Sequence, residues 1–489
     1  MGEKEMDMSE RLQALAKEKT AILHGDAERV AKQHADGKCT ARERIGKLLD
    51  AGSFVEMDAL RKGGNVVCGS GTVAGQAVYC FAQDYASMGG AMTKEQAEKI
   101  LKVLGMARKT GAPVVALMDS AGVKITEGAS AMPYYAEIVA AMARLSGVCP
   151  MIACVMGPCT GLSTLLTQVC DITIQVKKTG EIALNTALVM NTEKGKEKTS
   201  QQLFGAEVMA KQGACALTAE NEDEALAFVS ALINLLPASN MEDAMINLDA
   251  DLNRLMVCEN PDDVSSLMAD LCDDNRLIEL YKEFGAAVKV ALCRIGGRSC
   301  GVIATNPQEE GGRLTADACR KAARFVRLCD CYHLPVISLV NTEGLAVPCV
   351  CGQGNLIKAA AELTYAYAEA TAPKIALMTG NAVGAAYVAM GGKNIADVSY
   401  AWPTAMIAPL TKEVAVQTMD ADLLLKGEKR ADLEEKYMEA CGALNAAAQG
   451  IVDDVIEPRE SRKYIIAAME LLASKHDVNL PKKHGNLPL

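Results

Sequence analysis

The sequence predicts an α/β protein made of two copies of one fold. Three observations support this: a long internal repeat, a regular alternation of apolar strands with amphipathic helices, and glycine turns where the strands end. At 489 residues the chain exceeds what one hydrophobic core normally supports, so two domains are expected. We place them at residues 1–250 and 251–489.

The repeat runs through most of the chain. The segment "AMTKEQAEKILKVLGMARKTGAPVVALMDSAG" at 91–122 returns as "RLTADACRKAARFVRLCDCYHLPVISLVNTEG" at 313–344, an offset of 222 residues. The segment "CPMIACVMGPCTG" at 149–161 returns as "APKIALMTGNAVG" at 372–384, an offset of 223. A nearly constant offset across separate segments indicates duplication.

Both copies have the same predicted order of elements. A β-hairpin signal at Gly-Gln or Gly-Gly-Arg precedes a helix, and a Pro-headed apolar strand then ends at Gly122 or Gly344. A second helix and a second Pro-headed strand follow. This alternation predicts parallel strands joined by crossover helices, with ligands at the carboxyl ends of the strands.

The second strand of the first copy shows the turn pattern in detail. It runs from Pro150 to Met156, is expected to stop at Gly157-Pro158, and is followed by Gly161 and a helix over 162–169. Such a turn exposes backbone N–H groups at the start of a helix, where negative charge is favoured. The alternative is that Gly161 only allows close packing of helix on strand.

Segments outside the repeat are simpler. Residues 238–262 form an acidic connection between the copies, the first 45 residues have a helical pattern, and "EKRADLEEKYMEACGALNAAAQG" at 428–450 predicts an amphipathic helix with a glycine stop.

Composition excludes several functions. The net charge of −11 disfavours nucleic acid and anionic membrane as partners. Eighteen cysteines are scattered through apolar runs, which indicates reduced core thiols, and neither Cys-x-Cys pair, 329/331 or 349/351, has zinc-finger spacing, so no metal is expected. No signal peptide and no run of about 18 apolar residues occurs, so we expect a cytoplasmic protein.

The glycine turns favour one kind of chemistry. Two turns per copy, both at strand ends, can direct two backbone N–H groups at one oxyanion, which needs no particular side chain. Phosphate-loop, nucleophile-elbow and zinc-protease motifs do not occur. We therefore expect a reaction in which activation arrives with the substrate rather than from ATP.

The sequence resembles the carboxyltransferase (β) components of biotin-dependent acyl-CoA carboxylases and their decarboxylase relatives, which have two crotonase-like domains of the ClpP/crotonase ββα superhelix type. The resemblance covers nearly the whole chain, and its most specific segments are "KQHADGKCTARERIGKLLDAGSFVEMD" (32–58), "VYCFAQDYASMGGAM" (78–92), "KTGAPVVALMDSAG" (109–122), "GPCTG" (157–161), "KAARFVRLCDCYHLPVISLV" (321–340), "YAYAEATAPK" (365–374) and "YAWPTAMIA" (400–408).

The resemblance implies roles for the two copies. The N-terminal copy is expected to hold an acyl-CoA, and the C-terminal copy carboxybiotin. The implied oxyanion-binding amides are those of Gly122, Val123, Gly161, Leu162, Gly344, Leu345, Ala385 and Ala386. The implied reaction moves a carboxyl group between biotin and the α-carbon of a short acyl-CoA, with no side chain as base.

Three positions depart from the family pattern. Lys124 replaces an arginine, and it is expected either to meet a CoA phosphate or acyl carboxylate or to be a solvated lysine. Leu162 puts an isobutyl group where close approach of the thioester is needed. Val388 replaces an aspartate near the acyl tail, which indicates either a more apolar acyl group or core filling.

The family also implies partners. Biotin is expected on a separate carrier protein, because the chain has no Ala-Met-Lys-Met-like site. The other expected partners are a biotin carboxylase or a membrane decarboxylase subunit, and the assembly is expected to be a hexamer of two stacked trimers. Two alternatives stay open: the α-subunit of a sodium-pumping acyl-CoA decarboxylase, which runs the same half-reaction backwards, and a non-catalytic CoA-binding scaffold.

Overall fold

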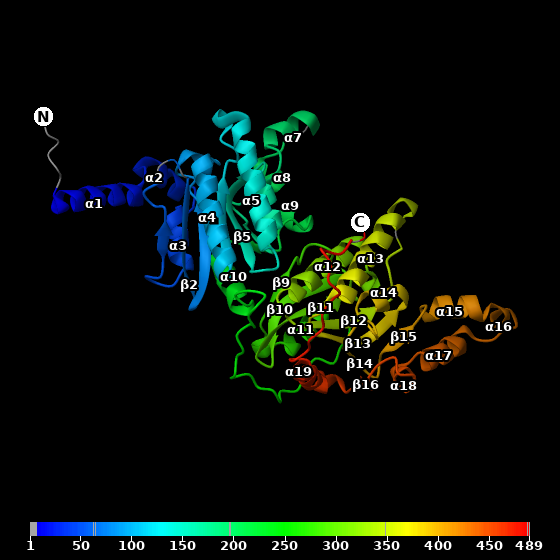
Figure 1. Ribbon diagram of the computed structural model, residues 1–489. Coiled ribbons are helices and arrows are strands. Elements are labelled where there is room, and N and C mark those ends of the chain that lie inside the picture. Colours follow the sequence, from blue (N-terminus) through cyan, green and yellow to red (C-terminus); the bar gives the residue numbers. More distant parts are fainter. Residues whose placement is uncertain are drawn as a thin grey trace. The chain divides into compact units, whose positions relative to one another are not determined.

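The computed structural model (Figure 1) describes residues 7–486 and 488, apart from residues 62, 64, 195, 196 and 348. The predicted helical N-terminus therefore lies partly outside the described residues, at 1–6. The chain divides into two compact units, Met1–Asp243 (unit 1) and Ala244–Leu489 (unit 2). The division falls a few residues before the predicted boundary at 250/251.

Unit 1 is an α/β unit with one mixed sheet. Its helices are α1 (Met8–His24), α2 (Ala27–Ala35), α3 (Ala41–Leu48), α4 (Lys94–Thr110), α5 (Met132–Leu145), α6 (Ser163–Val169), α7 (Ala187–Lys194), α8 (Ser200–Phe204), α9 (Ala206–Lys211) and α10 (Glu222–Leu235). Its strands are β1 (Val55–Met57), β2 (Val66–Val73), β3 (Gln76–Gln83), β4 (Val114–Ser120), β5 (Met151–Thr160), β6 (Ile172–Val176), β7 (Glu181–Ala183) and β8 (Leu217–Ala219). Short 3₁₀ turns η1 (Met88–Gly90) and η2 (Ile125–Ala131) precede α4 and α5.

Unit 2 repeats this plan. Its helices are α11 (Val264–Leu271), α12 (Ala316–Cys331), α13 (Gln353–Glu369), α14 (Gly384–Ala389), α15 (Lys412–Met419), α16 (Ala421–Leu425), α17 (Arg430–Ala440), α18 (Ala443–Ala448) and α19 (Ser461–Leu471). Its strands are β9 (Leu277–Leu280), β10 (Val288–Ile295), β11 (Arg298–Thr305), β12 (Val336–Thr342), β13 (Lys374–Val383), β14 (Val398–Ala401), β15 (Met406–Ala408) and β16 (Asp454–Val455). Its 3₁₀ turns are η3 (Asp273–Asn275), η4 (Glu310–Gly312), η5 (Val350–Gly352) and η6 (Pro458–Glu460).

The two sheets have the same topology, which confirms the predicted duplication. The order in unit 1 is β1-β2-β3-β4-β5-β6-β8, with β7 also paired to β5. The order in unit 2 is the matching β9-β10-β11-β12-β13-β14-β16, with β15 paired to β13. The hairpin strands pair antiparallel and the remaining strands pair parallel, as the strand–helix alternation predicts.

Residues matched by the repeat have matching structural roles. Thr93 and Thr315 cap α4 and α12, each accepting a backbone N–H three residues later. The buried Lys321 donates to the carbonyl oxygens of Tyr281, Phe284 and Gly285 at 3.0, 2.8 and 3.4 Å, so it secures the loop before β10. Burial lowers the pKa of this lysine to about 8.

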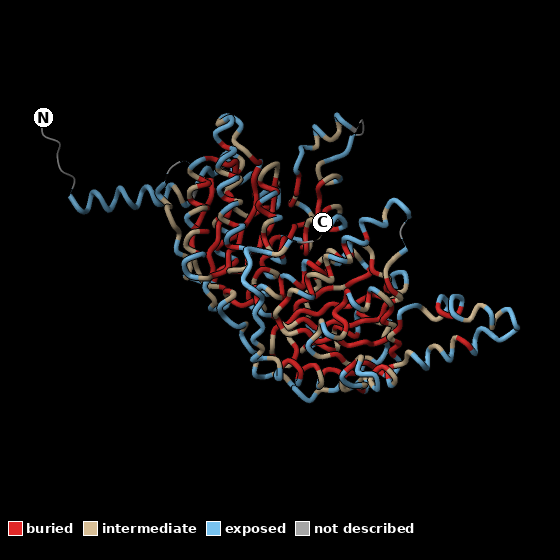
Figure 2. Tube along the Cα trace, turned by 45° about the vertical axis from the view of Figure 1, so that its right-hand side comes forward, coloured by how far each residue is buried: buried red, intermediate tan, exposed pale blue. Residues whose placement is uncertain are grey.

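Each unit has its own hydrophobic core. In unit 1, α4 and α5 cover the side of the sheet on which β4 and β5 place buried residues such as Met118 and Val155. All seven residues of β4 and all seven of β12 are buried, as expected for central strands of a parallel sheet covered on both faces. Figure 2 shows this buried interior within each unit.

Two predicted boundaries were wrong. Strand β5 does not stop at Gly157-Pro158 but continues to Thr160, because β7 pairs with it from Pro158 onward. The predicted helix over 428–450 is two helices, α17 and α18, interrupted at Cys441-Gly442, where the Cys441 carbonyl accepts from Ile407 N–H. Across the described part of the chain, no helix has both the length and the apolar character needed to span a bilayer.

Candidate active site

The two glycine turns of unit 1 lie side by side at the carboxyl end of the sheet. Ser120, at the end of β4, is opposite Cys159 in β5, after a register shift that begins at Met118. Gly122 follows with φ +100°, and a Cβ atom there would lie 2.9 Å from the Thr160 carbonyl oxygen. Only glycine fits such a position, because a side chain would meet both an unfavourable φ and a backbone atom.

Unit 2 has the corresponding arrangement. Thr342, at the end of β12, is opposite Ala382 in β13, again after a register shift. Gly344 follows with φ +121°, and Gly384 begins α14 with φ +58°. The duplication has therefore produced two similar pairs of turns, one pair in each unit.

Most backbone groups of the first turn are already used within unit 1. The Gly122 N–H donates to Ser120 Oγ at 3.1 Å, the Gly122 carbonyl accepts from Met92 N–H at 2.8 Å, and the Lys124 N–H donates to the Met92 carbonyl at 3.2 Å. These bonds leave the Val123 N–H without an acceptor in the described part of the chain. Val123, rather than Gly122, therefore supplies the available donor.

Unit 2 repeats this bonding pattern around Leu345. The Gly344 N–H donates to Thr342 Oγ1 at 3.1 Å. The Leu314 N–H donates to the Gly344 carbonyl, and the Leu314 carbonyl accepts from the Ala346 N–H, both at 3.0 Å. Among the described residues, none accepts a hydrogen bond from the Leu345 N–H. Similar bonds around Val123 and Leu345 indicate that the chain shape fixes both donors.

The second turn of each unit supplies a further donor. The Gly161 N–H donates to the Ala183 carbonyl at 2.8 Å, whereas the Leu162 N–H, just before α6, has no acceptor among the described residues. In unit 2 the N–H groups of Ala385 and Ala386 belong to the first turn of α14, where no intrahelical acceptor exists.

The structure also shows where the three departing side chains lie. Leu162 is half-buried and packs against the core of unit 1. Lys124 is half-exposed and forms an ion pair with Glu127 at 3.5 Å, and Val388 is exposed on α14, so the core-filling explanation of Val388 was wrong.

A buried ionic network supports the first turn, and the sequence did not predict it. Asp119, adjacent to Ser120, accepts from Lys38 Nζ at 3.1 Å and from the Arg44 guanidinium at 2.9 Å. Arg44 also pairs with Glu222 of α10 at 2.6 Å, and all four side chains are buried. The Asp119 carboxylate lies against Gly157, where a Cβ would be 2.0 Å from its Oδ1 atom, so it occupies the register shift between β4 and β5.

Unit 2 fills the same place with a neutral side chain. Asn341 lies against Gly380, accepts from the Asn381 N–H at 3.0 Å, and donates to Asp262 Oδ1 at 3.0 Å. The residue of unit 1 that matches Asn381 is Pro158, which has no N–H to donate. The carboxylate of unit 1 is therefore held by cations from the N-terminal segment, and a charged residue at the end of a predicted buried strand was the signal available in the sequence.

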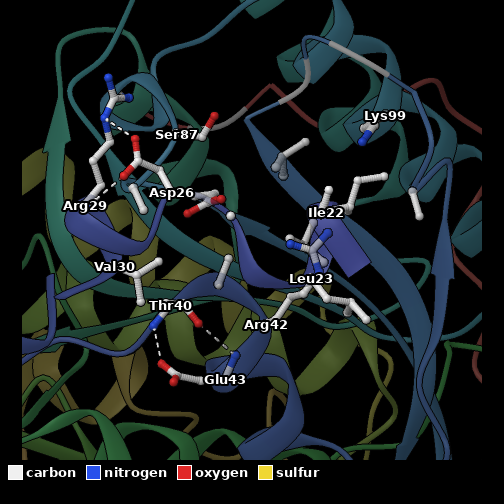
Figure 3. A pocket seen from close by; sticks show the side chains of 18 of the residues that line it. Ile22, Leu23, Asp26, Arg29, Val30, Thr40, Arg42, Glu43, Ser87 and Lys99 are labelled. Carbon is white, nitrogen blue, oxygen red and sulfur yellow. Dashed lines mark hydrogen bonds and ion pairs between the residues drawn. The ribbon is translucent and has the colours of Figure 1, made fainter. Parts of the chain in front are cut away.

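A separate cavity of about 630 Å³ lies in unit 1 between the α1–α2 turn, the start of α3 and the loop after β3 (Figure 3). Several of its charged side chains pair locally: Arg42 binds Glu56 through two hydrogen bonds, and Glu43 accepts from Thr40 N–H. None of the site residues predicted from the sequence lines this cavity.

The duplicated sheets and their paired turns fit the tandem crotonase-like class of protein that the sequence predicts. The family model described as the carboxyl transferase domain matches residues 32–487, so the chain belongs to this family. The predicted family is thereby confirmed.

Individual relatives show which acyl-CoA enzymes of this family the chain is similar to. The chain is 36% identical to a methylmalonyl-CoA decarboxylase subunit alpha from Veillonella parvula, over 97% of this chain and 100% of that protein. It is also 36% identical to a propionyl-CoA carboxylase beta chain from Saccharopolyspora erythraea (96% and 94%) and to a biotin-dependent acetyl-/propionyl-coenzyme A carboxylase beta5 subunit from Mycobacterium tuberculosis (98% and 95%). A crystal structure of transcarboxylase 12S with methylmalonyl-CoA and methylmalonic acid bound matches with a TM-score of 0.94 at 32% identity over 100% of both chains. The tandem crotonase-like fold is therefore confirmed.

Proposed function

We propose that the chain is the carboxyltransferase subunit of a biotin-dependent acyl-CoA carboxylase or decarboxylase. It would move a carboxyl group between biotin on a separate carrier protein and the α-carbon of a short acyl-CoA. The observation that carries the proposal is the pair of unused backbone donors at the strand ends of each unit, Val123 with Leu162 and Leu345 with Ala385 or Ala386.

Unit 1 is proposed to bind the acyl-CoA. The Val123 and Leu162 N–H groups would donate to the thioester oxygen and stabilise the negative charge that the oxygen gains when the α-carbon loses a proton or a carboxyl group. Fixed backbone donors need no reorganisation during the reaction, and losing one typically costs about 100- to 1000-fold in rate. The packing of Leu162 against the core supports access of a thioester to this turn.

Unit 2 is proposed to bind biotin. The unused donors at Leu345 and the start of α14 suit a neutral carbonyl oxygen such as that of the biotin ureido group, and the exposed Val388 lies on α14 beside them. Biotin would supply the carried carboxyl group. The chain's own residues would orient the ureido oxygen and stabilise charge on it, while no protein carboxylate or histidine is required as a base.

Relatives named for opposite directions of the reaction are equally similar to the chain: a decarboxylase subunit and a carboxylase chain are each 36% identical to it. We therefore expect the partner to set the direction of carboxyl transfer: a biotin carboxylase would favour carboxylation, and a membrane decarboxylase subunit would favour decarboxylation. The hexamer named for transcarboxylase 12S supports a hexameric assembly here, and a cytoplasmic location stays the prediction made from the sequence.

A transfer assay tests the proposal. Purified full-length protein is incubated with methylmalonyl-CoA or malonyl-CoA, with and without free biotin, and CO2 release is followed. We expect release that depends on biotin. CoA binding without turnover of either substrate would contradict the enzymatic proposal and favour the scaffold alternative.

A further inference from the structure

The loop that follows the first turn of unit 2 carries two exposed thiols. Cys349 immediately precedes η5 and Cys351 lies within it, and both are exposed. The Gly352 N–H donates to the Cys349 carbonyl at 2.8 Å, which closes a tight turn. Because this turn folds the chain back on itself, the two side chains lie next to each other.

The two sulfur atoms are in direct contact. Cys349 Sγ and Cys351 Sγ are 2.7 Å apart, so no movement of a distant segment is needed to bring them together. A hydrogen bond with the Cys351 thiol, and then one from the Gly352 N–H, lowers the pKa of Cys349. A thiol with a lowered pKa has more thiolate at neutral pH, and the thiolate is the form that attacks a disulfide.

Most other thiols of the chain are buried. Cys80, Cys154 and Cys215, for example, are buried, and burial raises the pKa of each to about 12. The repeat gives a second contrast, since the residues of unit 1 that match 349 and 351 are Glu127 and Ala129. The dithiol is therefore specific to unit 2 and was not inherited from the duplicated fold.

We propose that Cys349 and Cys351 form a site of reversible oxidation, at which a small-molecule disulfide such as oxidised glutathione converts the two thiols into an intramolecular disulfide. The inference rests on the geometry of this loop and does not depend on the proposed carboxyl transfer. The disulfide would close a three-residue ring directly before α13, in the loop that follows the candidate donor Leu345.

The chemistry balances with that oxidant. The Cys349 thiolate attacks one sulfur of the oxidant, which forms a mixed disulfide and releases one small thiolate. The Cys351 thiolate then attacks the Cys349 sulfur and releases the second small thiolate. The protein gives up two electrons and two protons, and the oxidant is reduced to two thiols.

Mass spectrometry of the full-length protein tests the site. The protein is incubated with oxidised glutathione at pH 7, free thiols are blocked with N-ethylmaleimide, and the tryptic peptide 328–358 is fragmented. We expect both Cys349 and Cys351 to escape blocking, with a loss of two hydrogen masses located between them, and we expect dithiothreitol to restore blocking at both.

The same peptide contains a matched control. Cys329 and Cys331 have the same spacing, but Cys329 is buried near the end of α12 and burial raises its pKa. We expect no disulfide between these two. Full blocking of 349 and 351 after treatment, or equal oxidation of both pairs, would overturn the proposal.

Two variants separate the roles of the thiols. In Cys351→Ser, the remaining Cys349 should keep a glutathione adduct, because no second thiol can displace it. In Cys349→Ser, the adduct should form more slowly, since the thiol with the lowered pKa is gone. A disulfide-linked dimer of the wild-type chain in place of the internal bond would also contradict the assignment.

Discussion

A backbone N–H group is the chemically active unit of this candidate site. At Val123 and Leu345 the peptide N–H is unused because the flanking carbonyl and N–H groups bond to Met92 and Leu314. Replacing a side chain leaves such a donor in place, so ordinary alanine substitution does not test it. Proline removes the hydrogen itself.

We expect Val123→Pro to lower kcat about 100-fold or more, because one of the two donors to the thioester oxygen is lost. The Val123 N–H makes no hydrogen bond within the described chain, so the substitution removes no internal bond of the fold. The measurement is kcat in the biotin-dependent CO2-release assay, with CoA affinity and thermal stability measured alongside.

Val123→Ala is the matched control, since it keeps the N–H and shortens the side chain. It should retain kcat within a few-fold. Equal losses in the two variants, or full activity of the proline variant, would show that the Val123 donor has no part in the reaction.

At the scale of elements, the end of β4 depends on a buried carboxylate. Asp119 fills the register shift between β4 and β5 and joins α3 to the sheet through Arg44. Taking charges out of water is costly, and the cost is repaid only while each charge keeps its partner. This network therefore makes the position of the first turn sensitive to the N-terminal segment.

Asp119→Asn should lower the free energy of unfolding by about 3–5 kcal/mol, because the buried cations of Lys38 and Arg44 lose the negative charge of the carboxylate that they share. Asparagine has nearly the same shape and is the natural residue at the matching position 341, so a steric effect is not expected. Urea unfolding of wild type and variant measures the change.

Lys47→Met provides the comparison, because Lys47 pairs with Asp223 on the surface at 2.7 Å. It should change stability by less than about 1 kcal/mol. A similar small change in Asp119→Asn would mean that the buried network contributes little to stability.

The sequence was sufficient to predict the duplicated helices and strands, but it did not predict the buried ionic network around Asp119. The repeat, the alternation of strands and helices, and the glycines at 122, 161, 344 and 384 are local patterns, and the sheets follow from them. The contact of Lys38 with Asp119 joins residues 81 positions apart, and no periodicity encodes such a pair. The same limit applies to the Gly122 amide: its bond to Ser120 depends on side-chain direction, which the turn pattern alone leaves open.

At the scale of the whole molecule, buried cysteines make stability depend on pH. Five thiols have their pKa raised by burial from an ordinary value near 9 to about 12: Cys80, Cys149, Cys154, Cys215 and Cys319. Between pH 9 and 12 the unfolded chain has lost these protons while the folded chain keeps them. The folded state therefore loses stability as pH rises through this window, by about 1.4 kcal/mol per thiol and pH unit.

Lys321 acts in the opposite direction. Burial lowers its pKa to about 8, so between pH 8 and its ordinary value near 10.5 the unfolded chain holds the extra proton and stability rises with pH. Tyr135 adds to the thiols, since burial raises its pKa to about 12 from an ordinary value near 10. The stabilising contribution of Lys321 offsets the destabilising contribution of about one thiol. Above pH 9 the net effect of these groups is therefore to destabilise the folded state.

We therefore expect cooperative alkaline unfolding near pH 10, because five thiols amount to about 7 kcal/mol one pH unit above 9, comparable with the 5–15 kcal/mol that typically separates folded from unfolded states. Circular dichroism and thiolate absorbance, followed together under reducing conditions, measure it. The thiolate signal of the buried cysteines should rise at the same pH at which the helices are lost, since these thiols ionise only when the core opens. If most thiols titrate near pH 9 while the circular dichroism stays native, then water reaches the cores of the two units without unfolding, and burial does not control the stability of this protein in alkali.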